Sequence, residues 1–339
     1  MNNLQEQFNN ANALLIQKKY DAATDAFLAL EKIPAVAPLC YYQLAVIANA
    51  TGDPEAACAL YYKAFEAMPN IAAQLYGDKH TSRTYVYKGK KEEKEQVNCP
   101  FCKQEAKPRW CYPLPEASGY NEFFNPVRIW MYCEPCHHMF ARHFPEKLFL
   151  HNANPRKANP ACFPYYSQIL SNIRARGFAQ GMDLFEIGIG ASECLLAARE
   201  IGYTVYGIDV IERHVEDAKN LYGLDAETAD INEFKADKQW DVIIMGDVIE
   251  HVSDPEEAMR KVKALMKDDG AVWVSTPSFE SAFSAVANHN DVMRRQQYHL
   301  NYFSRESFYA MLDRCGLVPV DYHISAHYNG SMEIVAIKK

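Results

Sequence analysis

The sequence lacks any apolar run near the ~18–20 residues that a membrane-spanning helix needs, which argues against a transmembrane protein. Its first ten residues, MNNLQEQFNN, lack the basic and then apolar pattern of a secretory signal, so we expect a cytoplasmic protein. The chain also lacks an excess of basic charge, since 35 Lys and Arg against 43 Asp and Glu give a formal net charge of −8. Because nucleic-acid backbones favour basic surfaces, this balance argues against nucleic acid as a partner.

Cysteine, in contrast, is plentiful. Ten cysteines in 339 residues, without a secretory signal, favour metal binding or buried thiols over disulfides. A chain of this length has room for two or three domains, because single hydrophobic cores stop growing near ~250 residues. We expect a helical domain at 1–75, a zinc-binding segment at 96–150 and an α/β domain at 160–339. Residues 76–95, which include a Lys- and Glu-rich stretch, are expected to be a solvated linker.

Residues 1–75 are Ala-rich and helical in period, which predicts an all-α domain. The pattern Ala23-x-x-x-Phe27 recurs as Ala57-x-x-x-Tyr61, and a proline follows each copy. That spacing resembles tetratricopeptide (TPR) repeats, in which small residues let paired helices pack closely. A plain helical hairpin that packs on its neighbour explains the pattern equally well. In either form, the domain is a candidate for docking a protein partner or for self-association.

The segment 96–150 contains two C-x-x-C pairs, a spacing that lets two thiolates from one tight turn occupy adjacent corners of a tetrahedron around Zn²⁺. The expected zinc ligands are Cys99, Cys102, Cys133 and Cys136. Four thiolates leave the metal no open position, so a structural role is favoured over a catalytic one. Three further residues could each replace one thiolate: Cys111, His137 and His138.

Strands and helices alternate from Met182 to the last residue, the pattern of a doubly wound parallel sheet. A buried strand starting at Asp183 runs into a turn that contains Gly188 and Gly190, and a helix follows. Glycines there allow the backbone to approach a ligand at the carboxyl end of the strand. The next strand ends at Asp209, whose carboxylate is placed to accept hydrogen bonds from ribose hydroxyls.

Glu193 indicates which nucleoside this turn binds. It takes the place of the third glycine of the dinucleotide motif G-x-G-x-x-G. A carboxylate at a helix N-terminus suits the helix dipole but would repel a pyrophosphate seated there. S-adenosylmethionine (SAM) has no phosphate and carries a cationic amine and a sulfonium. An acidic rim therefore favours SAM over NAD.

The ordered motifs from Phe163 to Lys339 resemble those of class I SAM-dependent methyltransferases. The resemblance implies a seven-stranded, mostly parallel doubly wound α/β sheet whose last strand is reversed. It implies that 230–231 contact the adenine and that the backbone of 246–248 borders the methionine part of SAM. The cofactor-binding residues implied in this way are Glu186, Gly188, Gly190, Ser192, Asp209, Val210, Asp230, Ile231, Gly246, Asp247 and Val248.

Methyl transfer is an in-line displacement, so the protein must align a nucleophile and, for a hydroxyl or an acidic carbon, remove its proton. A histidine is the natural base near neutral pH. His251 follows the fourth strand of the domain, and His299 and Tyr302 lie in the run H-x-x-Y-F-S, which resembles a substrate-covering segment of small-molecule methyltransferases. These three are the candidate catalytic residues. Alternatively, His251 only shapes the pocket and His299 makes a supporting hydrogen bond.

Two functions remain open from the sequence. In the first, the chain is a SAM-dependent methyltransferase of a small molecule, such as a sugar or a secondary-metabolite precursor, with a structural zinc. The zinc pairs ahead of the domain resemble nucleotide-sugar C-methyltransferases in part. In the second, the helical repeats recruit a protein that carries the methyl acceptor. A cofactor-binding regulator without catalysis is a third option.

Overall fold

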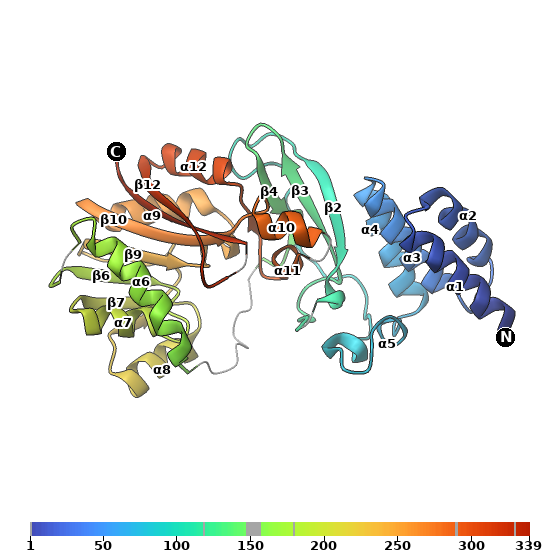
Figure 1. Cartoon of the computed structure of the whole chain (residues 1–339), viewed down its shortest axis with the longest axis horizontal. Helices are drawn as coiled ribbons and strands as arrows, with labels where there is room; N and C mark the ends of the chain where they lie inside the picture. Colours follow the sequence, from blue (N-terminus) through green and yellow to red (C-terminus); the bar gives the residue numbers. More distant parts are fainter. Residues whose placement is uncertain (1, 118, 147–156, 179, 289–290, 329) are drawn as a thin grey trace.

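The computed structural model describes residues 2–117, 119–146, 157–178, 180–288, 291–328 and 330–339 (Figure 1). The N-terminal helices lie at one end of the molecule, a small antiparallel sheet stands in the middle, and the large sheet with its helices forms the other end (Figure 1). Within the described residues, no helix is both long and apolar enough to cross a membrane.

Four helices form the N-terminal part: α1 (Asn2–Ile16), α2 (Tyr20–Leu30), α3 (Ala37–Ala50) and α4 (Pro54–Ala67). Both copies of the repeated pattern are buried, with Ala23, Phe27 and Ala57 fully covered and Tyr61 nearly so. Small residues at these points allow neighbouring helices to approach closely. Asp53 caps α4 by accepting a hydrogen bond from the backbone N–H of Ala56. The relation to tetratricopeptide repeats stays a prediction.

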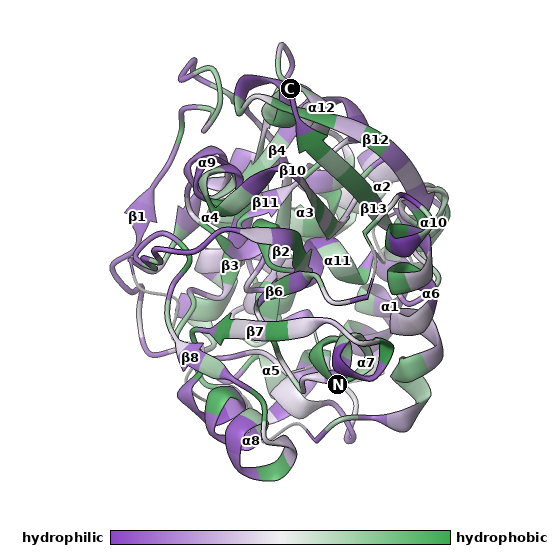
Figure 2. Cartoon of the chain, turned by 90° about the vertical axis from the view of Figure 1, so that its left-hand side faces the viewer, coloured by the Kyte–Doolittle hydropathy of each residue, from purple (hydrophilic) through white to green (hydrophobic). Residues whose placement is uncertain are grey.

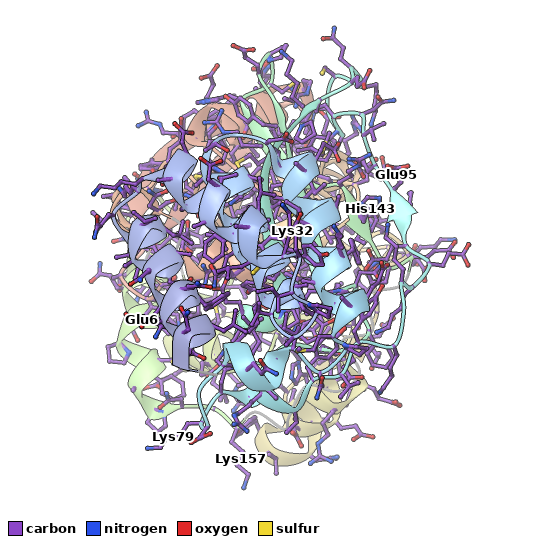
Figure 3. All side chains as sticks on the ribbon, turned by 90° about the vertical axis from the view of Figure 1, so that its right-hand side faces the viewer. Glu6, Lys32, Lys79, Glu95, His143 and Lys157 are labelled. Atoms are coloured by element: carbon purple, nitrogen blue, oxygen red, sulfur yellow. The ribbon has the colours of Figure 1, made fainter. Side chains whose placement is uncertain are left out.

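The chain between the helices and the small sheet is packed over part of its length. It contains α5 (Ala72–Leu75) and the 3₁₀ turn η1 (Thr81–Thr84), and then Tyr85 and Tyr87, which are both 8% exposed. The N–H of Tyr87 donates to the carbonyl of Pro69. Further along, β1 (Lys94–Glu95) pairs with β5 (His143–Phe144). Figure 3 labels Glu95 and His143 on this exposed ribbon, where their side chains pair at 3.5 Å.

The small sheet has four strands in the order β11-β4-β3-β2. Three of these strands follow one another in the sequence: β2 (Lys107–Pro113), β3 (Val127–Cys133) and β4 (His138–Ala141). The 3₁₀ turn η2 (Leu114–Glu116) follows β2. The fourth, β11 (Asn301–Tyr302), comes from the C-terminal half and pairs antiparallel with β4. Helix α4 packs on the other side, against β2 and β3. The small sheet therefore joins the helical domain to the α/β domain.

The large sheet has seven strands in the order β12-β13-β10-β9-β6-β7-β8. Its strands are β6 (Asp183–Ile187), β7 (Thr204–Asp209), β8 (Ala226–Thr228), β9 (Trp240–Gly246), β10 (Met266–Pro277), β12 (Leu317–Ile324) and β13 (Ser331–Lys338). Strand β13 runs antiparallel to both of its neighbours, and the pairings among β6 to β10 are parallel. The predicted seven-stranded, mostly parallel sheet with a reversed last strand is confirmed.

Helices cover both faces of this sheet because its central strands are apolar on both faces. Along β9, Val242 and Ile244 pack into one buried cluster, while Ile243 and Met245 pack into the other. Figure 2 shows β13 largely in the hydrophobic colour, whereas helix α8 carries both colours. The remaining elements are η3 (Pro160–Cys162), α6 (Phe163–Arg174), α7 (Glu193–Ile201), α8 (Glu212–Tyr222), η4 (Ile249–His251), α9 (Pro255–Leu265), α10 (Ala282–Ala287), α11 (Val292–Arg295) and α12 (Arg305–Arg314).

Candidate functional site

The turn after β6 has the backbone geometry of a ligand loop. Gly188, Gly190 and Ser192 all have positive φ angles, of 78°, 49° and 70°. A Cβ on Gly188 would lie 2.4 Å from Cγ2 of Val248, whereas a Cβ on Gly190 would meet no atom within 4 Å. Gly188 thus allows two loops to approach each other, and Gly190 faces open space at the carboxyl end of the strand, where α/β sheets bind ligands.

Asp209 lies at the end of β7, beside this turn. Its carboxylate accepts hydrogen bonds from the backbone N–H groups of Gly190 (3.0 Å) and Ile211 (2.8 Å) and pairs with Nδ1 of His214 (3.2 Å). The side chain therefore holds the glycine turn against β7. The neighbouring Val210 is 38% exposed, as expected of an apolar side chain that is available to a ligand.

Glu186 is a buried carboxylate within β6. It is 5% exposed, and its Oε2 has no hydrogen-bond partner among the described residues. Burial, and then the charge of Glu193, raises the pKa of Glu186 well above its ordinary value. A neighbouring cation would offset the cost of ionising this buried carboxyl group. Of the predicted adenine-side residues, Asp230 is exposed and Ile231 is buried.

The loop after β9 continues the same edge of the sheet. Gly246 ends the strand, and Asp247 follows with a φ of 50°. The N–H of Asp247 donates to the carbonyl of Ser275 (3.0 Å), and the hydroxyl of Ser275 donates to the Asp247 carboxylate (3.1 Å). Burial raises the pKa of Asp247 to about 6, and Glu333 adds to this shift. The predicted residues 186–192, 209 and 246–248 thus meet at one edge of the sheet.

Beyond this loop, Glu250, His251 and His299 form a cluster. Oε1 of Glu250 lies 4.0 Å from Nε2 of His251 and 3.9 Å from Nε2 of His299. Glu250 is 1% exposed, and Thr276 donates to its other oxygen at 3.0 Å. Among the residues that the structure describes, none donates to Oε1. Burial, and then Asp247, raises the pKa of Glu250 well above its usual value.

Backbone carbonyls determine the tautomers of both histidines. Nδ1 of His251 donates to the carbonyl of Tyr298, and Nδ1 of His299 donates to that of Met293, each at 2.9 Å. In the neutral rings, both Nε2 atoms then carry a lone pair. Burial lowers the pKa of His251, and burial together with His251 and Arg128 lowers that of His299. The ligand atoms of the cluster lie within 4.8 Å of one another, so the cluster could also hold a divalent cation.

Tyr302 lies apart from these two histidines. Its ring is 1% exposed within the small sheet, packed near Trp130 and Phe279, and its hydroxyl donates to Asp291 at 2.7 Å. This placement favours a structural role, although Tyr302 stays a candidate. In the polar stretch 288–295 that precedes this segment, His289 and Asn290 lie outside the described residues. Arg294 is buried against Tyr112, Ser284 and Asp291, and Arg295 pairs with Glu116.

The four predicted zinc ligands converge. Sγ atoms of Cys99, Cys102, Cys133 and Cys136 lie within 4.8 Å of one another, and those of Cys102 and Cys133 are 3.6 Å apart. A tetrahedron with Zn–S bonds near 2.3 Å has edges of about 3.8 Å. The N–H of Phe101 also donates to Sγ of Cys99, a common way to stabilise a thiolate. The residues present therefore fit a zinc ion.

The three spare ligand candidates have other partners. Cys111 lies in β2, and its buried thiol shares a hydrogen bond with that of Cys58. His137 pairs with Glu280 and Glu306. His138 is fully buried and bonds Asn301, and burial lowers its pKa to about 3.

Sequence reasoning missed Arg128, Thr276 and Asn301. Arg128 and Asn301 contact the backbone around the histidine cluster, and Thr276 holds the carboxylate of Glu250. Thr276 stands at the end of the fifth parallel strand, next to the site edge, and could have been proposed from that position. Arg128 lies in the cysteine-rich segment, and nothing in its local pattern connects it with residues 296–299.

Residues 156–322 match the model of a methyltransferase domain family. A ubiquinone biosynthesis O-methyltransferase of Bordetella avium is 30% identical over 108 residues, which are 30% of this chain and 44% of that protein. The enzyme of that name from Caulobacter vibrioides is 31% identical over 109 residues, covering 30% of this chain and 43% of that protein. The chain thus spans about half the length of the curated relatives that it matches.

Among solved structures, magnesium protoporphyrin IX methyltransferase from Synechocystis, with bound S-adenosylhomocysteine, is 14% identical, with a TM-score of 0.44 over 55% of this chain and 90% of that one. A 1,6-didemethyltoxoflavin N1-methyltransferase from Burkholderia thailandensis is 15% identical, with a TM-score of 0.43 over 53% of this chain and 80% of that one.

Proposed function

We propose that this chain, whose residues 156–322 match the model of a methyltransferase domain family, is a SAM-dependent methyltransferase that acts on a hydroxyl group of a small molecule. One observation supports the proposal above others: the Nε2 atoms of two neutral histidines lie 3.9 to 4.0 Å from the same buried carboxylate oxygen. This arrangement lies next to the loops that the methyltransferase motifs assign to SAM.

The edge of the sheet fits SAM chemically. Glu186 has an unpartnered, buried carboxylate oxygen, and Glu193 and Asp209 add negative charge around the glycine turn. These groups would attract a cationic amine and a sulfonium and would repel a pyrophosphate. Asp209 would bind the ribose, and 246–248 would border the methionine part. SAM, when bound, supplies a methyl group on a sulfonium that a nucleophile can displace.

The histidine cluster would remove the proton of the acceptor. A hydroxyl within hydrogen-bond reach of Nε2 of His251 or His299 transfers its proton to that nitrogen. The imidazolium that results keeps its Nδ1–H bond to a backbone carbonyl, and its new Nε2–H lies toward the oxygen of the acceptor, with Oε1 of Glu250 about 4 Å from Nε2. The carboxylate thus stabilises the charge that forms on the base, while Thr276 holds its other oxygen in place.

The curated relatives support an oxygen acceptor, because the matches quoted above are named ubiquinone biosynthesis O-methyltransferases. A hydroxyl also needs the base that the cluster provides, whereas a neutral amine does not. We infer that the four cysteines bind a structural zinc. It would hold together the two turns at Cys99 and Cys133.

The experiment uses the full-length protein, SAM with a labelled methyl group and a cell extract divided into protein and small-molecule fractions. We expect label to enter the small-molecule fraction and to be stable to the base treatment that hydrolyses methyl esters. Label only on protein would support the second function, in which residues 1–75 recruit a protein acceptor. A groove of about 440 Å³ lined by Tyr42, Gln43, Tyr76, His80 and Glu116 is the candidate surface for that function. No transfer to any fraction, with SAM bound, would contradict both.

A further inference from the structure

Residues 294–302, here called the bridging segment, connect the histidine cluster with the small sheet. On the cluster side, the N–H of Leu300 donates to the carbonyl of Glu250 (2.8 Å), and the Asn301 amide donates to that of Val252 (2.7 Å). The carbonyl of Tyr298 accepts from His251, as described above. The segment therefore contacts the site through its own backbone as well as through His299.

On the other side, five carbonyls of the bridging segment accept hydrogen bonds from residues of the small sheet. Arg128 of β3 donates to three of them: Nη1 to His299 (2.8 Å) and Gln296 (3.3 Å), and Nη2 to Gln297 (2.7 Å). Nε1 of Trp130 donates to the carbonyl of Arg294 (3.0 Å). The N–H of Ala141 donates to that of Leu300 (2.8 Å).

Arg128 is unusual because its charge is buried without an acidic partner. It is 3% exposed, and within the described residues no carboxylate lies within salt-bridge distance of it. Burial lowers its pKa to about 10, so the guanidinium is charged at neutral pH. Burying an unpaired charge is costly unless hydrogen bonds compensate for it. Here the compensation comes from three backbone carbonyls within four consecutive residues, a geometry that suits the planar fork of arginine.

We propose that Arg128 is a positioning residue for the methyl transfer: by holding the carbonyls of 296, 297 and 299, it keeps His299 and the His251 partner Tyr298 in register with Glu250. The cysteine-rich segment is then part of the catalytic machinery and not an appended module. The proposal rests on the proposed function for its catalytic consequence, whereas its structural consequence can be measured without any acceptor.

The mechanism follows from the distances. His251 and His299 are useful as bases only while both Nε2 atoms stay near 4 Å from Oε1 of Glu250. Their Nδ1 partners are the carbonyls of Tyr298 and Met293, which lie in or next to the bridging segment. Without Arg128, three carbonyls lose a charged donor and the segment can shift. A misplacement of about 1 Å at reacting groups can cost about 10²-fold in rate.

The test compares Arg128→Met and Arg128→Lys with the matched control Arg109→Met, in the full-length protein. Arg109 lies on the adjacent strand β2, is exposed, and stacks on Trp110 and Tyr132 without contacting the bridging segment. Hydrogen exchange at the amides of 296–301 is measured first, with zinc content and calorimetric SAM affinity. Methyl transfer is then measured with the labelled small-molecule fraction identified above.

For Arg128→Met we expect exchange at 296–301 to accelerate at least tenfold. We expect kcat to fall about 10- to 100-fold, with SAM affinity, KM for SAM and zinc content close to those of the wild type. Arg128→Lys, which retains the charge and up to three donors, should recover part of kcat, and Arg109→Met should match the wild type. If Arg128→Met shows the same hydrogen-exchange rates at 296–301 and the same kcat as the wild type, the proposal is overturned.

Two other outcomes are also decisive. If Arg128→Met fails to fold, Arg128→Lys is used alone: a lower kcat with unchanged KM for SAM supports positioning, and unchanged kcat with faster exchange overturns it. If no acceptor exists, the proposed function fails. The hydrogen-exchange data then still test whether the hydrogen bonds from Arg128 stabilise the bridging segment.

Discussion

The replacement Glu250→Gln tests the role of the buried carboxylate most directly. Gln retains the shape of the side chain and the oxygen that accepts from Thr276, but it removes the negative charge. In the proposed mechanism that charge faces an imidazolium that forms during proton transfer, with 3.9 to 4.0 Å between Oε1 and the two Nε2 atoms. Two unit charges 4 Å apart interact by about 4 kcal/mol at an effective dielectric constant near 20, and by about 1 kcal/mol in water.

Since each 1.4 kcal/mol is a factor of ten, these limits correspond to losses in kcat of about 5-fold to about 10³-fold. Because Glu250 is 1% exposed, we expect the upper part of this range, a loss of about 10²-fold or more. The measurement is kcat at pH 8, where a carboxyl group with a raised pKa is most fully ionised. SAM affinity, measured by calorimetry, should change little.

The stability of the variant separates this effect from misfolding. The pKa of Glu250 is raised in the folded protein. The folded state therefore loses stability as the pH rises from the pKa of the group in the unfolded chain, near 4.5, toward its higher pKa in the folded protein. Above that window the wild type carries a cost that Gln does not, so Glu250→Gln should melt at the same temperature or higher at pH 8. Glu256→Gln is the matched control: this buried acid, 6% exposed, pairs with Arg260 and Arg314 and should lose stability but not kcat. A folded Glu250→Gln variant with less than a threefold loss of kcat would refute the reasoning.

Three further predictions concern the cofactor edge, the metal and pH. Gly188→Ala places a Cβ 2.4 Å from Val248 at a positive φ, so calorimetry should show at least tenfold weaker SAM binding, and unchanged affinity would contradict the ligand-loop assignment. Cys133→Ser removes one of the four thiolates, so metal analysis should show loss of zinc. Near-ultraviolet circular dichroism should show loss of packing around Trp130. Full zinc content in this variant would exclude the four-cysteine site. Burial lowers the pKa of His251 and His299, so both bases stay neutral below their ordinary value of 6.5. In the Glu250→Gln variant, where that carboxyl group no longer titrates beside them, kcat should stay level from pH 8 to 6.5 and decline only at lower pH. A decline that starts above pH 7 in a pH–rate profile would argue against these histidines as the base.

Much of the α/β domain could be predicted from the sequence because its signals are local. A buried strand, a glycine turn and a helix follow one another within twenty residues around Gly188, and β7 ends at Asp209 as expected. The four cysteines were also predictable, since metal ligands in tight turns have a fixed spacing. Parallel strands bring their carboxyl ends to one edge, which explains why 246–248 meet the glycine turn.

Contacts between distant segments could not be predicted. The pairing of β11 with β4 and the bonds from Arg128 to 296–299 depend on how two domains pack, and no periodicity encodes that. Tyr302 illustrates the limit: its motif suggested a residue over the substrate, whereas the fold places its hydroxyl on Asp291. Likewise, Tyr85 and Tyr87 lie directly before the Lys- and Glu-rich stretch but are buried against Phe65 of the helical domain.

The shared sheet also has a consequence for synthesis. Strand β4 leaves the ribosome about 160 residues before β11, which at roughly 5–20 residues per second is a delay of about 8 to 32 seconds. During that time the edge of β4 and the charged guanidinium of β3 have no partner. If the four cysteines bind zinc as proposed, metal loading would hold the two cysteine turns together while the nascent chain grows, but the last strand is added only when the α/β domain is nearly complete. Metal supply during translation should therefore affect the yield of native protein more than metal supplied after release.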